Sequence, residues 1–137
     1  MTSDAGPEAG GRREARERAI ELAYEADIRS WSPDEIVASL TVAPDSFVVR
    51  LLEWSAKRRR ESDELIEKKA TGWSLSRMPS MDLLIMRMAV AEMLEADTPT
   101  GVVLAEATEL ATRYSTDDSG GFVNGVLAAV AKDIRPE

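Results

Sequence analysis

The chain lacks both cysteine and histidine, and each absence narrows the chemistry that it can support. Without cysteine there is no disulfide, no thiolate nucleophile and no thiolate metal ligand. Without histidine the chain has neither the most versatile general base nor the commonest protein ligand of metals, which disfavours nucleophilic triads and zinc sites. We therefore expect no cofactor and no metal site, and the composition is compatible with a reducing compartment.

Aromatic residues are also scarce, at 5% of the 137 residues, and no stretch shows the sustained alternation of a β-strand. Ala, Leu, Glu, Met and Arg are plentiful instead, which favours helix. The length and the hydrophobic content of 44% suit one globular domain. The formal net charge of -8 argues against a surface that binds polyanions throughout, so any nucleic-acid contact has to be local.

No hydrophobic run in the sequence is long enough to span a bilayer comfortably. Residues 1–11 are small, polar and rich in Gly, unlike a signal peptide, and we expect a disordered N-terminal arm there. The most apolar stretch, Ser80 to Leu94, would form a helix of roughly 22 Å interrupted by three charges. It is too short for a membrane, so we expect no membrane association and interpret it as a buried core helix.

Arg87 stands in the middle of this core helix. An unpaired cation in an apolar setting costs several kcal/mol, so the guanidinium requires a carboxylate. We predict Glu106, on the following helix, as that partner, with Glu109 as the alternative.

We predict the first helix from Arg12 to about Ser30, because alanine and leucine residues recur there at the spacing of one helix face. Arg12 and Arg16 fall on the same side of it as Ala19 and extend the buried face with positive charge. Cations in the first turn oppose the helix macrodipole, an arrangement that a bound phosphate would relieve. The alternative is that these arginines pair with neighbouring glutamates and keep the helix end soluble.

Later breaks in the chain predict further helices. Ser32-Pro33-Asp34-Glu35 is typical of a helix start and predicts a short helix to about Leu40. Asp45 is suited to cap a long third helix that runs to about Ala70. Within it, the basic run from Lys57 to Asp63 is interpreted as a solvated turn with the i,i+4 ion pairs Lys57–Glu61 and Arg60–Glu64. A second phosphate-facing patch is the alternative.

The C-terminal part continues the helical pattern. Gly72 ends the third helix, residues 73–79 form a connector with a short helical turn, and Pro99 precedes a helix that reaches Tyr114. In the last helix we expect Val123, Val126, Leu127 and Val130 to face inward. Gly125 is interpreted as a place where a neighbouring helix comes close. Phe122, at the exposed start of this helix, is either a lid on the core or a recognition surface.

Three segments together resemble the NusB family of bacterial transcription antitermination factors. The opening resembles that family's arginine-rich first helix, with the sequence R-R-E-A-R-E-R-A-I-E-L-A-Y. The core helix is similar through its central arginine in L-L-I-M-R-M-A-V-A-E-M-L. The most specific segment comes near the end of the chain, where F-V-N-G-V-L follows an acidic loop. The resemblance covers nearly the whole chain, from Arg12 to Pro136.

The resemblance implies an all-α fold of two small packed bundles with about six or seven helices, residues 12–70 forming the first bundle and residues 71–137 the second. It also implies a cytoplasmic protein without enzymatic activity. Such a protein binds boxA, a single-stranded element of ribosomal RNA leader transcripts, together with NusE, a small-subunit ribosomal protein. The pair helps RNA polymerase in the antitermination complex to resist termination.

Matching positions imply which residues take part. The basic RNA-contacting cluster corresponds to Arg12, Arg13 and Arg16, and the family's tyrosine corresponds to Tyr24, at the RNA and partner-protein surface. Asp82 corresponds to an acidic residue near that surface. Asp118 and Phe122 match the loop and helix start that border the RNA, with Phe122 also expected at the protein partner. Single-stranded RNA is held by cations on phosphates and by rings on splayed bases, which suits these residue types.

The sequence departs from the family pattern at Glu14, Ala105, Thr112 and Gly121. At each, a hydrogen-bonding or positively charged residue is common in the family. These departures support an alternative, a homodimeric protein-interaction module with weak or lost RNA binding. A NusB-like domain also occurs fused to RNA cytosine methyltransferases, but those carry catalytic cysteines, which this chain lacks.

Overall fold

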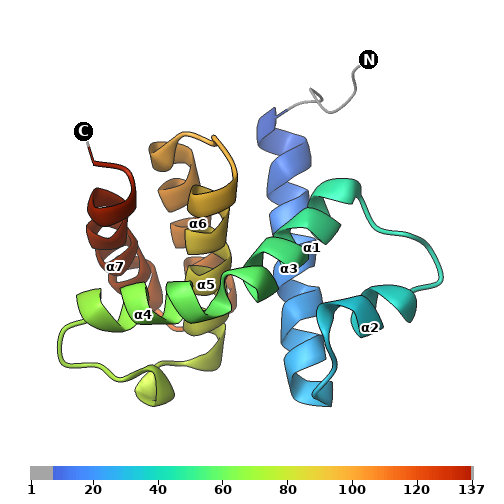
Figure 1. The fold of residues 1–137 in the computed structure, drawn as a ribbon, viewed down its shortest axis with the longest axis horizontal. Helices are drawn as coiled ribbons and strands as arrows, with labels where there is room; N and C mark the ends of the chain where they lie inside the picture. The colour runs from blue at the N-terminus through green and yellow to red at the C-terminus, as the bar shows by residue number, and fades with distance from the viewer. Residues whose placement is uncertain (1–7, 137) are drawn as a thin grey trace. The chain divides into compact units, whose positions relative to one another are not determined.

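A computed structural model describes residues 8–136 as a helical protein (Figure 1). The elements are α1 (Glu8–Arg29), α2 (Pro33–Ala38), α3 (Ser46–Lys57), α4 (Arg59–Lys69), the short 3-10 helix η2 (Leu75–Arg77), α5 (Ser80–Glu95), α6 (Thr100–Tyr114) and α7 (Ser119–Ile134). No strand occurs in this described range. The predicted all-α class with six or seven helices is confirmed.

The N-terminal helix begins earlier than the sequence indicated. α1 starts at Glu8, whereas we predicted an arm up to residue 11 and a helix from Arg12. The remainder of the predicted arm, residues 1–7, lies outside the described residues.

The chain divides into two compact units: unit 1 ends at Glu53 and unit 2 begins at Trp54. Two bundles were predicted with a division after Ala70, but α4 packs against α5 and α7 and so belongs to unit 2. The apolar stripe of α4 therefore serves the C-terminal core, through the fully buried Ile66.

Unit 1 is built from α1, α2 and the first part of α3, and its helix starts are fixed by local hydrogen bonds. The Ser32 hydroxyl accepts from the Glu35 N–H at 3.1 Å, and the Glu35 carboxylate accepts from the Ser32 N–H at 2.7 Å, which completes the predicted cap of α2. The Asp45 carboxylate accepts from the Phe47 N–H at 2.7 Å and caps α3 as predicted. The buried side chains of α1 are Ala15, Arg16, Ala19, Ile20, Leu22 and Ala26.

Unit 2 is organised around α5, which lies beside α6 and α7 and is crossed by α4 (Figure 1). Every residue from Ile85 to Met93 is buried, as expected for a helix that is apolar on nearly all sides. The inward positions predicted for α7, Val123, Val126, Leu127 and Val130, are all buried.

Arg87 is bound by Asp63 of α4, so the prediction of Glu106 as its partner is wrong. The Arg87 Nε donates to Asp63 Oδ1 at 2.6 Å, and Nη2 donates to Oδ2 at 3.1 Å. Asp63 closes the basic run that was interpreted as a solvated turn. Because α4 packs on α5, this carboxylate reaches the core helix. The Arg87 side chain is 10% exposed, and two parallel hydrogen bonds to Asp63 compensate its buried charge.

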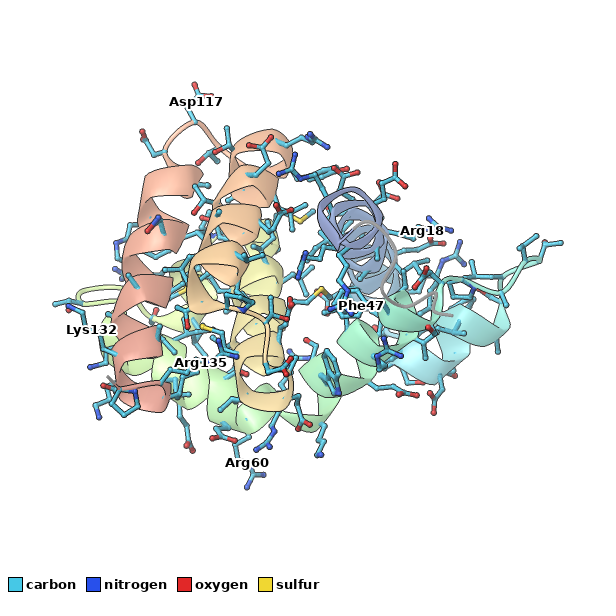
Figure 2. All side chains as sticks on the ribbon, turned by 90° about the horizontal axis from the view of Figure 1, so that it is seen from above. Arg18, Phe47, Arg60, Asp117, Lys132 and Arg135 are labelled. Atoms are coloured by element: carbon cyan, nitrogen blue, oxygen red, sulfur yellow. The ribbon has the colours of Figure 1, made fainter. Side chains whose placement is uncertain are left out.

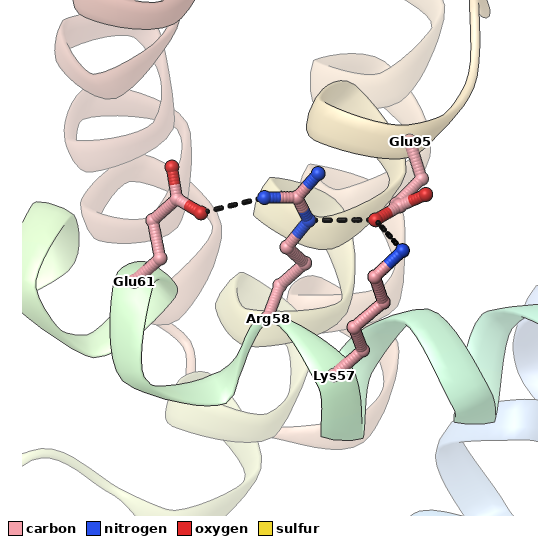
Figure 3. Close-up of polar contacts among 4 residues, drawn as sticks. All are labelled: Lys57, Arg58, Glu61 and Glu95. Atoms are coloured by element: carbon pink, nitrogen blue, oxygen red, sulfur yellow. Dashed lines mark hydrogen bonds and ion pairs between the residues drawn. The ribbon is translucent and has the colours of Figure 1, made fainter.

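The predicted long third helix is in fact two helices, interrupted at Arg58. The Arg58 Nε donates to Glu95 Oε2 at 2.6 Å, and its Nη1 donates to Glu61 Oε1 at 2.8 Å (Figure 3). Lys57 pairs with the same Glu95 oxygen at 3.1 Å, and not with Glu61 as predicted. The hydrogen bond from Arg58, followed by that from Lys57, holds the pKa of the Glu95 carboxyl below its ordinary value. Part of the basic run is thus bound to the C-terminal end of α5.

The close approach between helices occurs at Gly120 and not at Gly125, which corrects another prediction. Gly125 is exposed, and a Cβ there would meet nothing within 4 Å. At Gly120, in the first turn of α7, a Cβ would lie 2.5 Å from the Thr112 hydroxyl oxygen of α6. The pattern of apolar residues identified the helix correctly but could not show which of its glycines faces a neighbour.

Candidate nucleic-acid interface

The exposed face of α1 carries Arg13 and Tyr24. These residues are eleven positions apart, which places them roughly 20° from each other around a regular helix. Arg13 is exposed and Tyr24 is 40% exposed. Glu17 and Glu21 lie between them on the same face. α1 therefore presents one arginine and one tyrosine in a row that also holds two carboxylates.

Arg12 and Arg16 occupy a different face of α1, turned toward α3. The Arg12 guanidinium carbon lies 4.3 Å from the centroid of the Phe47 ring, and that of Arg16 lies 5.5 Å from it. Figure 2 labels Phe47 beside α1. Arg12 is half-buried, whereas Arg16 is 6% exposed. Both distances are within the range of cation–π attraction, so the ring holds two of the three arginines of the predicted basic cluster.

A further arginine reaches the same ring from α3 itself. The Arg50 guanidinium carbon lies 5.6 Å from the Phe47 centroid, and Arg50 is half-buried. Neither Phe47 nor Arg50 was among the candidates from sequence. The available signal was the i,i+3 spacing of an aromatic residue and an arginine on one helix. Only the placement of α1 beside α3 brings further arginines to the same ring.

In unit 2, Asp82 is an internal residue of the fold. Its carboxylate is 2% exposed and accepts hydrogen bonds from the hydroxyls of Ser115 and Ser119. The Ser119 hydroxyl oxygen also accepts a hydrogen bond from the Thr116 N–H at 3.2 Å. We expected Asp82 near a binding surface. Its observed contacts instead join the start of α5 to the loop between α6 and α7.

The same loop borders an open pocket of about 350 Å³. Phe122 and Trp73 form one part of its lining, with ring centroids 5.8 Å apart and ring planes at 59°. Trp73 is 47% exposed, although the sequence placed it only in a connector. The exposed Asp118 lies at the rim, and Asp82 contributes to the lining. A pocket with aromatic walls and acidic oxygens can accept a planar group that carries hydrogen-bond donors.

The predicted site residues thus fall into two groups. Arg12, Arg13, Arg16 and Tyr24 share α1 in unit 1, and the structure adds Phe47 and Arg50 to them. Asp82, Asp118 and Phe122 meet around the pocket in unit 2, with Trp73 as an additional member. Within residues 8–136, no group of three or more acidic side chains is arranged to hold a metal ion. Nor is any helix in this range long and apolar enough to cross a membrane.

Comparison with known proteins relates the chain to one family. The model of the NusB family matches residues 13–132. The transcription antitermination protein NusB of Acidothermus cellulolyticus is 48% identical over 124 residues, which are 87% of this chain and 86% of that protein. NusB of Saccharopolyspora erythraea is 39% identical over 129 residues, covering 89% of this chain and 87% of the relative.

Solved structures agree with this relationship. T. maritima NusB superimposes with a TM-score of 0.80 at 30% identity, covering 89% of this chain and 91% of that one. A crystal structure of antitermination factors NusB and NusE in complex with dsRNA matches with a TM-score of 0.74 at 28% identity, covering 89% and 96%.

Proposed function

Since the chain belongs to the NusB family, we propose that it is a transcription antitermination factor that binds boxA-type RNA together with NusE. The observation that carries the proposal is the 48% identity to a NusB protein over 87% of this chain, within a family match from residue 13 to 132. The structure of NusB with NusE and dsRNA, similar to this chain along most of its length, supports both partners.

The distribution of charge suits a shared site. With a formal net charge of -8, the protein repels RNA over most of its surface, and the arginines of α1 are a local exception. Such a protein binds RNA weakly alone and gains affinity when a second protein completes the contact. The protein binds without catalysing a reaction, acts in the cytoplasm where bacterial transcription takes place, and works as part of the RNA polymerase antitermination complex.

A second candidate is the homodimeric module with weak RNA binding. It is favoured by Thr112 and Gly121, two exposed positions without charge where basic residues are common in the family. Light scattering measures assembly, and a dimer that does not dissociate when RNA and NusE are added would favour this candidate.

The test of the proposed function is RNA binding with and without NusE, measured by fluorescence anisotropy of a labelled boxA RNA. We expect weak binding by the protein alone and tight binding by the mixture. The affinity should fall with salt, with a log–log slope of about -0.7 for each phosphate neutralised on a single strand. Equal affinity with and without NusE would contradict the shared site, and no binding by the mixture would contradict the function.

Arg13→Ala sharpens this test because Arg13 is exposed and its loss leaves the core intact. If Arg13 contacts a phosphate, the variant binds more weakly and the slope becomes shallower by about 0.7. Arg18→Ala is the matched control: Arg18 is on the same helix, half-exposed and paired with Glu21 at 3.4 Å. The helical angle of 100° per residue turns it about 140° away from Arg13. Equal losses in the two variants would mean that only the general charge of the helix matters.

A further inference from the structure

We infer that α3 supplies a second part of the RNA contact: Arg50 binds a phosphate, and Phe47 is the positioning residue that holds Arg12, Arg16 and Arg50 together. The inference rests on the proposed function and adds two residues to it. It is argued from contacts within unit 1.

The first step is the geometry around the Phe47 ring. Three guanidinium carbons lie 4.3, 5.5 and 5.6 Å from its centroid, from Arg12, Arg16 and Arg50. All three distances are within the approximately 6 Å over which a ring attracts a cation. Arg12 and Arg16 come from successive turns of α1, and Arg50 from the turn of α3 that follows Phe47. One ring therefore gathers charges from two helices.

The second step is that the ring is firmly placed. Phe47 is 5% exposed, and its N–H donates to the Asp45 carboxylate at 2.7 Å, which fixes the start of α3. The buried Val48 and Leu51 anchor the same turn. Side chains carried by rigid helices are held more precisely than side chains on loops. Less conformational entropy of the protein is therefore lost when RNA binds.

The third step is electrostatic. Arg50 forms no ion pair with any described residue, so its charge remains available to a ligand. Its guanidinium presents parallel N–H donors that match the oxygens of a phosphate. A single strand of RNA supplies phosphates in succession, which suits several cations at one place.

A second arginine–ring pair in unit 1 differs from Arg50 and Phe47 because its arginine also has an ion pair. The Arg29 guanidinium carbon lies 4.8 Å from the Trp31 ring, but its Nε also donates to Glu25 at 3.0 Å. That pair is neutralised within the helix and offers little charge to RNA. Arg29→Gln is therefore the matched control for Arg50→Gln.

The experiment measures binding of labelled boxA RNA to the complex of the full chain with NusE, over a range of salt concentrations. Arg50→Gln should weaken binding three- to tenfold and make the log–log slope shallower by about 0.7, whereas Arg29→Gln should change neither. The inference is wrong if Arg50→Gln keeps the wild-type slope while the wild-type complex binds RNA, a result that leaves the proposed function intact. If the wild-type complex binds no RNA, both fail together.

Two further measurements separate positioning from folding. Phe47→Leu keeps an apolar side chain but removes the ring, so we expect a shallower slope with unchanged helix content and unchanged NusE binding. Phe47→Tyr keeps the ring and should restore the slope. A slope equal to that of the wild type in Phe47→Leu would reject the positioning role. A loss of NusE affinity in Arg50→Gln without RNA would assign Arg50 to a carboxylate of the protein partner and overturn the phosphate assignment.

Discussion

The buried and half-buried arginines are held differently in the two units. In unit 2 their guanidinium groups are bound by oxygen atoms: Arg58 and Arg87 by carboxylates, and Arg135 by backbone carbonyls. In unit 1, the guanidinium groups of Arg12, Arg16 and Arg50 lie 4.3 to 5.6 Å from the centroid of one aromatic ring, that of Phe47. A carboxylate neutralises the cation and a carbonyl orients it, while the ring orients Arg50 and leaves its charge in place, because Arg50 has no ion pair among the described residues.

Under the inference above, the same residue type serves stability in unit 2 and recognition in unit 1. An arginine bound to carboxylates or carbonyls connects segments of the fold, so its removal should lower the free energy of unfolding. The half-buried Arg50 adds little to stability through its contact with the ring, and its removal should instead change RNA affinity and salt dependence. Stability measurements on variants of unit 2 therefore test whether its arginines serve the stability of the fold.

The largest effect is expected from Arg87→Ala, which leaves the Asp63 carboxylate without its bidentate partner. Breaking a fully buried pair costs about 3–5 kcal/mol. Because the Asp63 side chain is 24% exposed, water can solvate part of it, and we expect the free energy of unfolding to fall by about 2–3 kcal/mol. Urea denaturation measures the change. Arg18→Ala, at a surface pair, should cost at most about 0.5 kcal/mol, and equal costs would break the comparison.

A smaller loss is expected from Arg135→Ala, at the end of α7. Arg135 donates to the carbonyls of Met93 and Ala96 at 3.0 and 2.8 Å, and also to the Thr98 carbonyl. These bonds hold the connection between α5 and α6. Water can replace some of them near the surface, so we expect a loss of about 1–2 kcal/mol in the free energy of unfolding.

Lys132→Ala is the control for Arg135→Ala. Lys132 is in the last turn of α7 and Arg135 directly follows the end of that helix (Figure 2), but Lys132 is exposed and has no hydrogen bond to a described residue. Its substitution should change thermal and urea stability by no more than about 0.5 kcal/mol. A loss equal to that of Arg135→Ala would show that charge near the helix end matters more than the carbonyl contacts.

The smallest effect concerns pH and the Glu95 carboxyl. Arg58 and Lys57 lower its folded-state pKa below the ordinary value of 4.5, so the folded state favours the ionised form. The resulting stabilisation is complete above the unfolded pKa and disappears as the pH falls through the lower folded pKa. Glu95→Gln should therefore be less stable than the wild type at pH 7, and the difference should shrink under acid. A difference independent of pH would contradict the ion-pair account.

Much of the fold was predictable because its signals are local. Helix starts such as Ser32 and Asp45 depend on bonds over two or three residues, and the buried core helix from Ser80 depends on the spacing of its own apolar side chains. For the candidate site, the resemblance implied Arg13 and Tyr24 as residues of the RNA surface, and both are exposed on α1. Trp73 went unrecognised, because nothing in a connector predicts that its ring will meet Phe122.

By itself, then, the sequence determined most of the helices and the caps at Ser32 and Asp45, because those depend on neighbours within one or two turns. Its motifs also identified the family. The tertiary structure alone decided that Asp63 binds Arg87, that Asp82 lies inside the fold, and that Phe47 gathers three arginines. Apart from that of Phe47 with Arg50, which share α3, these contacts join segments far apart in the chain. Their partners follow from how helices pack, and many pairings are compatible with the same pattern of residues.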